Sequence, residues 1–260
     1  MEKIPIFDCD VCLGVANNPI ESKVTTVSGI IETMDYYQID NALIYHKEAV
    51  RSPVYGNKKI IEELAGYPSL YGCAVLTPSY GGEYGSDIAA YFKMLVESEI
   101  KAIRLFPRVH NYRPIPLYLD TVLEEAQKHQ MPVIIDEIDV DIPGLPVGTW
   151  NFSPSYEDIY ELSIAYPKVN FIIISPGMLT HRKQFTIMHK TNNVHIVYSS
   201  FGYQNAEYIC EHFSADKILF GTGFPILEPG AYMSYLLYAD ISDGEKKMIA
   251  YDNLKKLLGV

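Results

Sequence analysis

The feature that most constrains the fold is a regular alternation of short apolar runs with longer amphipathic segments along the chain. The runs are rich in β-branched residues and almost continuously apolar. This pattern predicts strands that are buried on both faces, as in a parallel sheet covered by helices. We expect the strands at residues 4–9, 41–46, 70–76, 100–106, 132–136, 169–175, 194–200 and 217–223.

Eight such units in 260 residues predict an α/β fold with one domain, residues 1–260, built as a (β/α)8 TIM barrel. An open, doubly wound sheet is the alternative. It commonly has fewer strands, and no glycine-rich phosphate-binding turn follows the first run. Two helix starts are also predicted: Ser86 is the expected N-cap of the helix after the third run, and Ser153 or Ser155 that of the helix ending near Tyr166.

The charge balance excludes some classes of partner. Lys and Arg total 21 against 32 Asp and Glu, so the formal net charge is −11, which argues against nucleic acid and against anionic membranes. No apolar run approaches the ~20 residues that cross a bilayer, and the first residues lack the apolar core of a signal peptide. Four cysteines in a chain of this length form no disulfide framework, so we expect a cytoplasmic protein.

The chemistry of such a barrel lies where the strands end and the following loops begin. Because parallel strands all end on the same side, residues at these positions are expected to share one end of the barrel. The candidates are Asp10, Cys12, His46, Thr77, Arg104, Asp136, Ser175, Ser199, Ser200 and Gly223.

Several segments resemble one known family. I-F-D-C-D-V-C-L-G resembles the opening motif of the amidohydrolase superfamily, D-x-H-x-H-x-G, with both histidines replaced. K-A-I-R-L-F-P, P-V-I-I-D, Y-P-K-V-N-F-I-I-I-S-P-G, N-V-H-I-V-Y-S-S and I-L-F-G-T-G-F-P resemble strands four to eight of the amidohydrolase-related subfamily, which contains decarboxylases and lactonases. Y-D-N-L-K-K-L-L-G resembles its closing helix. The resemblance covers essentially the whole chain and implies the metal-dependent-hydrolase form of the barrel.

The departures from the family pattern concern the metal centre. The resemblance implies one or two divalent metals, held at the positions that correspond here to Asp10, Cys12, Asp136, Ser175 and Gly223. None of these is a histidine, and glycine offers no ligand atom. We therefore expect no cofactor. If a metal is bound, we expect zinc at Asp10, Cys12 and Asp136, although this set mixes a soft thiolate with hard carboxylates.

The first strand carries several candidate residues. Its period of two places Asp8, Asp10 and Cys12 on one face, with Asp10 as a candidate catalytic residue and Asp8 as a buried carboxylate bonded to backbone or to a cation. Cys9 and Cys12 are three residues apart, so their thiols are expected on opposite faces and not as a redox pair. Cys12 is either a nucleophile with His46 as its base or an inert buried thiol.

Arg104 lies inside an apolar strand, where a charged side chain is seldom buried without a partner. Asp10 and Asp136 would repel each other in a pocket of low dielectric constant. We hypothesise that the guanidinium takes the electrostatic place of the family's metal and pairs with Asp10 or Asp136. The alternative is an Arg104 that faces outward and pairs with a helix.

The resemblance implies a hydrolase that acts on a small organic molecule, but the replaced ligands predict that metal-dependent activity is lost. Two classes of function remain open. The first is a divergent enzyme that uses Asp10 and Asp136 as acid and base and Arg104 to bind an anionic substrate. The second is a non-catalytic barrel, a pseudoenzyme that serves as a ligand-binding or interaction module. A small-molecule substrate or ligand is expected as the partner, and a homo-oligomer is possible because barrels of this family often pair.

Overall fold

A computed structural model describes residues 3–15, 22–78, 84, 87–137, 155–174, 181–201 and 206–260. Its strands form one eight-stranded sheet in the order β1 to β8, and each strand runs parallel to the next. The strands are β1 (Phe7–Leu13), β2 (Asn41–His46), β3 (Leu70–Leu76), β4 (Ile100–Leu105), β5 (Val133–Asp136), β6 (Phe171–Ile174), β7 (Val194–Val197) and β8 (Ile218–Leu219).

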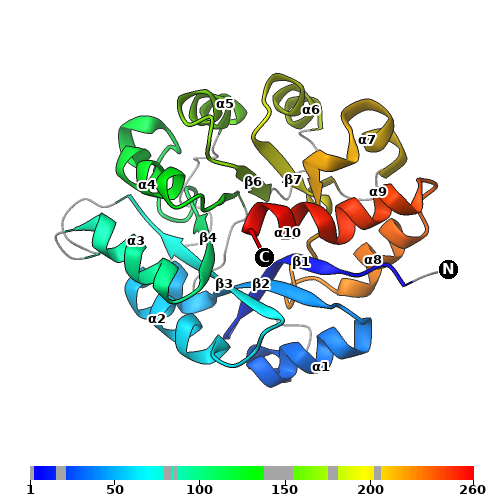
Figure 1. Cartoon of the computed structure of the whole chain (residues 1–260), viewed down its shortest axis with the longest axis horizontal. Helices are drawn as coiled ribbons and strands as arrows, with labels where there is room; N and C mark the ends of the chain where they lie inside the picture. Colours follow the sequence, from blue (N-terminus) through cyan, green and yellow to red (C-terminus); the bar gives the residue numbers. More distant parts are fainter. Residues whose placement is uncertain are drawn as a thin grey trace.

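The chain after β8 returns to β1 and closes the ring. The Cys9 N–H donates to the Phe220 carbonyl (3.0 Å), and the Cys12 N–H donates to the Phe224 carbonyl (2.8 Å). The predicted (β/α)8 barrel is therefore confirmed (Figure 1).

Helices surround the sheet in Figure 1. None of them, over the described ranges, combines the length and the hydropathy that a membrane span requires. The helices are α1 (Val27–Tyr37), α2 (Pro53–Leu64), α3 (Ile88–Glu97), α4 (Pro116–Lys128), α5 (Tyr156–Ala165), α6 (His181–Lys190), α7 (Ala206–Phe213), α8 (Pro229–Leu237), α9 (Asp243–Lys247) and α10 (Asn253–Leu258). Short helical turns are η1 (Ser22–Thr25), η2 (Lys47–Val50), η3 (Tyr198–Phe201), η4 (Ala215–Lys217) and the π-helical η5 (Met248–Asp252).

Two buried apolar layers explain why the strands are almost continuously apolar. In β5, Val133 and Ile135 pack between the strands and the helices, whereas Ile134 packs inside the barrel. Both faces of the strand are therefore removed from water. Burying one side chain of this size contributes about 1.5–3 kcal/mol to stability.

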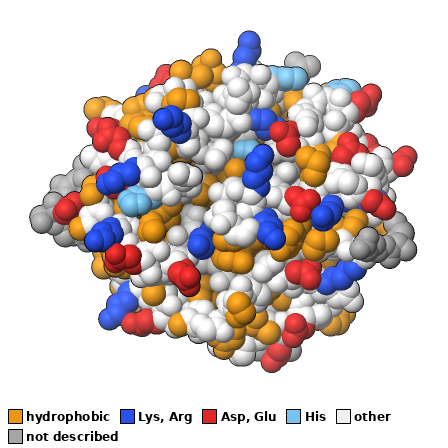
Figure 2. Space-filling model, viewed as in Figure 1, with side chains coloured by type: hydrophobic (Ala, Val, Ile, Leu, Met, Phe, Trp, Pro, Cys, Tyr) orange, Lys and Arg blue, Asp and Glu red, His pale blue; other side chains and the backbone are white. Residues whose placement is uncertain are grey.

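The C-terminal helix α10 closes the end of the barrel where the strands begin. Leu254 and Leu258 join the inner layer together with Phe7 at the start of β1, and α10 crosses the centre of the ring in Figure 1. Figure 2 shows the same face, on which basic and acidic side chains are both scattered among apolar ones. The candidate site residues lie at the other end, where the strands finish.

Some predicted boundaries are confirmed and others shift. Ser155 caps α5 in a capping box with Asp158, as predicted. The N-cap of α3 is Asp87, not Ser86, because Asp87 Oδ1 accepts the N–H groups of Ala89 and Ala90; Ser86 lies outside the described residues. β1 begins later than predicted, and β8 is only two residues long because the chain beyond it joins β1 through separate backbone hydrogen bonds.

Candidate active site

A bulge in β1 decides which way its side chains face. Between Asp8 and Val11, β1 has one residue more than the paired stretch of β2, and the pairing register shifts there. As a result Cys9 and Cys12 both lie in the inner layer. The prediction that their thiols face opposite ways was wrong, because it assumed a regular pleat. Both are free and buried.

Asp8 faces away from the cluster around Asp10. Its Oδ1 accepts the N–H groups of Asp10 and Thr222 (both 3.0 Å), and its Oδ2 accepts the Thr222 hydroxyl (2.5 Å). The expectation of a buried carboxylate bonded to backbone is confirmed, but the expectation of one face shared with Asp10 and Cys12 was wrong. Burial raises the pKa of Asp8 to about 7, although the hydrogen bonds with Thr222 and Asp10 oppose this.

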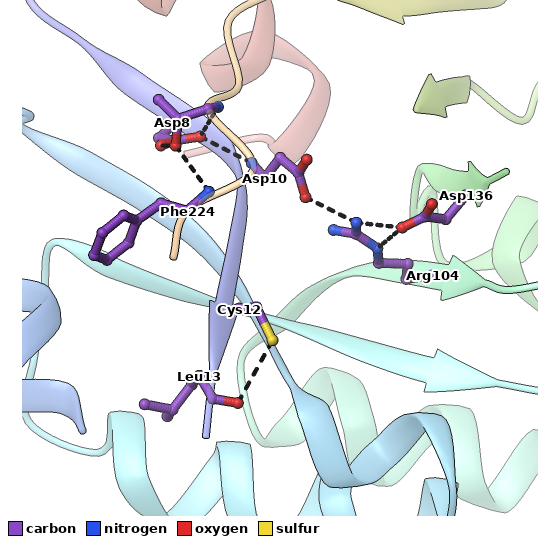
Figure 3. Close-up of polar contacts among 8 residues, drawn as sticks. Asp8, Asp10, Cys12, Leu13, Arg104, Asp136 and Phe224 are labelled. Carbon is purple, nitrogen blue, oxygen red and sulfur yellow. Dashed lines mark hydrogen bonds and ion pairs between the residues drawn. The ribbon is translucent and has the colours of Figure 1, made fainter. Parts of the chain in front are cut away.

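Asp10, Arg104 and Asp136 meet at the carboxyl end of the barrel. Arg104 Nη2 donates to Asp10 Oδ1 (2.8 Å) and to Asp136 Oδ2, and Arg104 Nε donates to the same Asp136 oxygen (3.0 Å). Figure 3 shows the guanidinium between the two carboxylates, which come from β1 and β5. The three side chains are 5%, 2% and 1% exposed. The expected pairing of Arg104 with these carboxylates is confirmed.

Two aromatic rings support the guanidinium. Arg104 Cζ lies 4.1 Å from the ring centre of Tyr45 and 5.3 Å from that of Phe106, close enough for cation–π attraction. Burial disfavours the charge, but the Asp10 and Asp136 carboxylates outweigh it and raise the pKa of Arg104 well above its usual value. Arg104 is therefore a permanent cation in this cluster.

Two polar atoms of the cluster take no part in its hydrogen bonds. Arg104 Nη1 and Asp10 Oδ2 have no hydrogen-bond partner among the described residues. Gly223 lies beside Asp10, with φ at +74°, and a Cβ built on it would stand 3.6 Å from Asp10 Oδ2 and 3.1 Å from Leu227 Cδ1. A side chain at position 223 would therefore crowd Leu227 and lie in contact with this carboxylate oxygen.

The structure does not bring Cys12 and His46 together. Cys12 pairs in register with Tyr45, and its Sγ lies 3.8 Å from the Leu13 carbonyl. Burial raises the pKa of the Cys12 thiol to about 11. His46 Nδ1 accepts the Glu48 N–H (3.1 Å), and burial lowers the pKa of its ring. The thiol is held neutral and the imidazole is engaged elsewhere, an arrangement that does not activate a nucleophile.

Two residues at this end of the barrel were not singled out from the sequence. The Tyr45 ring packs against the Arg104 guanidinium. Lys47, which directly follows β2, is only 8% exposed. The sequence contains a signal for Lys47, because a lysine that immediately follows a predicted strand stands at the end of the barrel where the chemistry lies.

Comparison with models of known families identifies the family of this sequence. The model of an amidohydrolase family matches residues 72–260. The chain belongs to this amidohydrolase family. No curated protein matches this sequence.

Solved structures share its fold over nearly the whole length. An uncharacterised TIM-barrel protein from Bordetella bronchiseptica is 16% identical with a TM-score of 0.75, covering 98% of both chains. A 5-carboxyvanillate decarboxylase from Novosphingobium aromaticivorans, complexed with manganese, is 12% identical with a TM-score of 0.75, covering 98% of this chain and 96% of that chain. A probable 2-pyrone-4,6-dicarboxylic acid hydrolase from Acinetobacter baumannii is 13% identical with a TM-score of 0.67, covering 98% and 99%.

The positions that the resemblance assigns to metal ligands hold a buried ion-pair cluster. Over the described residues, no three or more His, Cys, Asp or Glu side chains lie together in a way that could hold an ion. Ser175 lies outside the described residues, and Gly223 has no side chain. The two carboxylates at ligand positions, Asp10 and Asp136, share Arg104 instead.

Proposed function

We propose that this amidohydrolase hydrolyses a small organic molecule at a carbonyl group, and that it does so without the family's metal centre. The observation that carries the proposal is the guanidinium of Arg104 bonded to both Asp10 and Asp136. A divalent cation at these carboxylates would compete with a buried permanent cation for the same oxygens. Gly223 supplies no further ligand. The residues present therefore do not fit a divalent metal, and no step is routed through one.

Asp10 is the general base in this proposal. Its Oδ1 binds Arg104, while its Oδ2 lies beside Gly223 and accepts no hydrogen bond from the described residues. A water molecule held by Oδ2 gives its proton to Asp10 as the water oxygen attacks the carbonyl carbon. The base must be within hydrogen-bond reach of that proton, and Oδ2 is the oxygen that meets this condition.

Asp136 positions Arg104 for its own role. It accepts hydrogen bonds from Nε and Nη2, which fixes the plane of the guanidinium and leaves Nη1 to donate to the carbonyl oxygen. Negative charge develops on that oxygen during attack, where a preorganised donor is most effective. The proton on Asp10 then passes to the leaving oxygen, so Asp10 acts as base and afterwards as acid.

The experiment is a hydrolysis screen of lactones and esters with a pH indicator, on protein whose metal content is measured before and after treatment with a chelator. We expect turnover that survives chelation and is lost in Asp10→Asn. Asp158→Asn is the matched control, because Asp158 is also buried and paired with an arginine, Arg113 at 2.5 Å, but on α5. Turnover that chelation abolishes and manganese or zinc restores would overturn the metal-free mechanism.

The burial of the cluster favours a second candidate, a non-catalytic barrel. Asp10, Arg104 and Asp136 are at most 5% exposed, so the network can hold β1, β4 and β5 together without meeting a substrate. In that case no ester or lactone is turned over, and Asp10→Asn lowers only the free energy of unfolding. The same screen, with urea denaturation of both variants, separates the two candidates.

A further inference from the structure

Thr222 lies shortly after β8, between Gly221 and Gly223, and is completely buried. We propose that Thr222 and Asp8 are positioning residues for the hydrolytic reaction. Together they fix the orientation of Asp10, so that its carboxylate stays where it can accept the proton of the attacking water. This inference rests on the proposed hydrolytic function and adds to it two residues that act through the general base.

The Asp8 carboxyl group joins two segments that are distant in the sequence. Its Oδ1 accepts the Asp10 N–H and the Thr222 N–H, both at 3.0 Å. Its Oδ2 accepts the Thr222 hydroxyl at 2.5 Å, and Thr222 Oγ1 in turn accepts the Phe224 N–H at 3.2 Å. All four residues are buried, so the loss of one of these bonds leaves a polar atom without a partner away from water. The Asp8 side chain therefore holds the backbone of Asp10 and the segment 222–224 together.

The segment that Asp8 holds also contacts Asp10 directly. The Gly223 N–H donates to the Asp10 carbonyl at 3.0 Å, so the N–H and the carbonyl of Asp10 are both bound in this arrangement. A Cβ built on Gly221 would stand 3.1 Å from Asp10 Cβ, and one built on Gly223 would stand 3.6 Å from Asp10 Oδ2. The backbone of residues 221–223 thus lies along the Asp10 side chain and limits the rotamers that its carboxylate can adopt.

Asp10 connects this network to the ion-pair cluster. Figure 3 shows its backbone bonded to Asp8 on one side and its Oδ1 pointing toward Arg104 on the other. Arg104 is held separately, because its Nε and Nη2 both donate to Asp136. The guanidinium therefore does not follow when Asp10 moves. A shift of the Asp10 backbone weakens the bond between Oδ1 and Nη2 and moves Oδ2 away from Gly223.

Substrate binding and proton removal depend on different atoms of this site. In the proposed reaction, Arg104 Nη1 binds the carbonyl oxygen and Asp10 Oδ2 takes the proton from water. Loss of the Thr222 hydroxyl disturbs the base but leaves the guanidinium in place, because Asp136 holds it. Displacement of a reacting group by about 1 Å can lower a rate ~100-fold. We therefore expect kcat to fall while KM changes little.

Steady-state hydrolysis by variants of Thr222 tests this expectation. Thr222→Val replaces the hydroxyl with a methyl group of similar size and should lower kcat about 10–100-fold with little change in KM. Thr222→Ser keeps the hydroxyl and should recover most of kcat. Thr191→Val is the matched control, because Thr191 is also buried and its hydroxyl donates to the Ile187 carbonyl at 2.7 Å, between α6 and β7. Equal kcat in Thr222→Val and Thr191→Val would overturn the inference, and so would a rise in KM at unchanged kcat.

A double-mutant cycle tests the positioning without any substrate. Asp10→Ala is introduced into wild type, Thr222→Val and Thr191→Val, and the loss of unfolding free energy that it causes is measured by urea denaturation. If Thr222 holds Asp10 against Arg104, this loss should be smaller in Thr222→Val than in the other two proteins, because the effects of coupled residues are not additive. Thr222→Ala replaces Thr222→Val if the valine variant does not fold.

The cycle separates this inference from the proposed function. Equal losses in all three proteins would show that Thr222 adds stability independently of Asp10, which overturns its positioning role while hydrolysis can still stand. A smaller loss confined to Thr222→Val supports the positioning role, even if the hydrolysis screen finds no substrate.

Discussion

Asp8→Asn should remove part of the pH dependence of stability. Asparagine fits the site, because its Oδ1 can accept the two backbone N–H groups and its Nδ2 can donate to Thr222 Oγ1. The substitution therefore keeps a hydrogen bond to each partner, with the direction of the one to Thr222 Oγ1 reversed, and removes the titrating group. Any change in the pH profile is then due to the proton on Asp8.

The magnitude follows from the pKa of Asp8, which rises from 3.8 to about 7 on folding. The native state holds this proton more tightly than the unfolded state, so the contribution is full below pH 3.8 and is lost as the pH rises toward 7. Over about two pH units between pH 5 and pH 7, the loss is roughly 3 kcal/mol at ~1.4 kcal/mol per unit. The free energy of unfolding of Asp8→Asn, relative to wild type, should rise by this amount.

The assay is urea denaturation followed by circular dichroism at several pH values from 5 to 8, and the quantity compared is the difference between variant and wild type. The difference matters because His195 titrates in the same range with the opposite sign. Thr222→Ser is the control, since it keeps the hydroxyl that bonds Asp8, and it should retain the wild-type profile. Parallel profiles for Asp8→Asn and wild type would refute the reasoning.

Three further perturbations test other parts of the structure. Burial, with repulsion from Lys217, lowers the pKa of His195 to about 4, so its contribution is full above pH 6.5 and is lost as the pH falls toward 4; in urea denaturation, His195→Gln should remove a loss of roughly 3 kcal/mol over that window. Arg104→Met should cost roughly 3–5 kcal/mol because it leaves two buried carboxylates without a cation. The triple variant Asp10→Asn, Arg104→Met, Asp136→Asn should recover most of that stability, and an equally unstable triple variant would contradict the ion-pair explanation. Gly223→Ala should cost about 1–2 kcal/mol because a side chain is strained at this positive φ, and an unchanged urea midpoint would show that the strain is absent.

The barrel could be predicted from the sequence because its strands are apolar on both faces. A continuous apolar run such as the one that forms β5 is stable only when a second layer covers each side, and repeating that unit along the chain leaves a closed barrel as the natural arrangement. The meeting of Asp10, Arg104 and Asp136 followed from the same logic, since parallel strands bring their ends to one side.

The finer geometry of the site depended on contacts between distant segments. The bulge in β1 turned Asp8 toward Thr222 and both Cys9 and Cys12 inward, and no period of two could foresee it. Gly221 permits this close approach of the chain after β8, because a Cβ there would lie 2.6 Å from Val197 Cγ1 and 2.9 Å from Cys9 Sγ. Local pattern determined which residues reach the end of the barrel. The orientation of the β1 side chains at that end was decided by the tertiary structure. Hydrogen bonds and packing between β1 and the chain after β8 select one register, and that register sets the direction of each side chain.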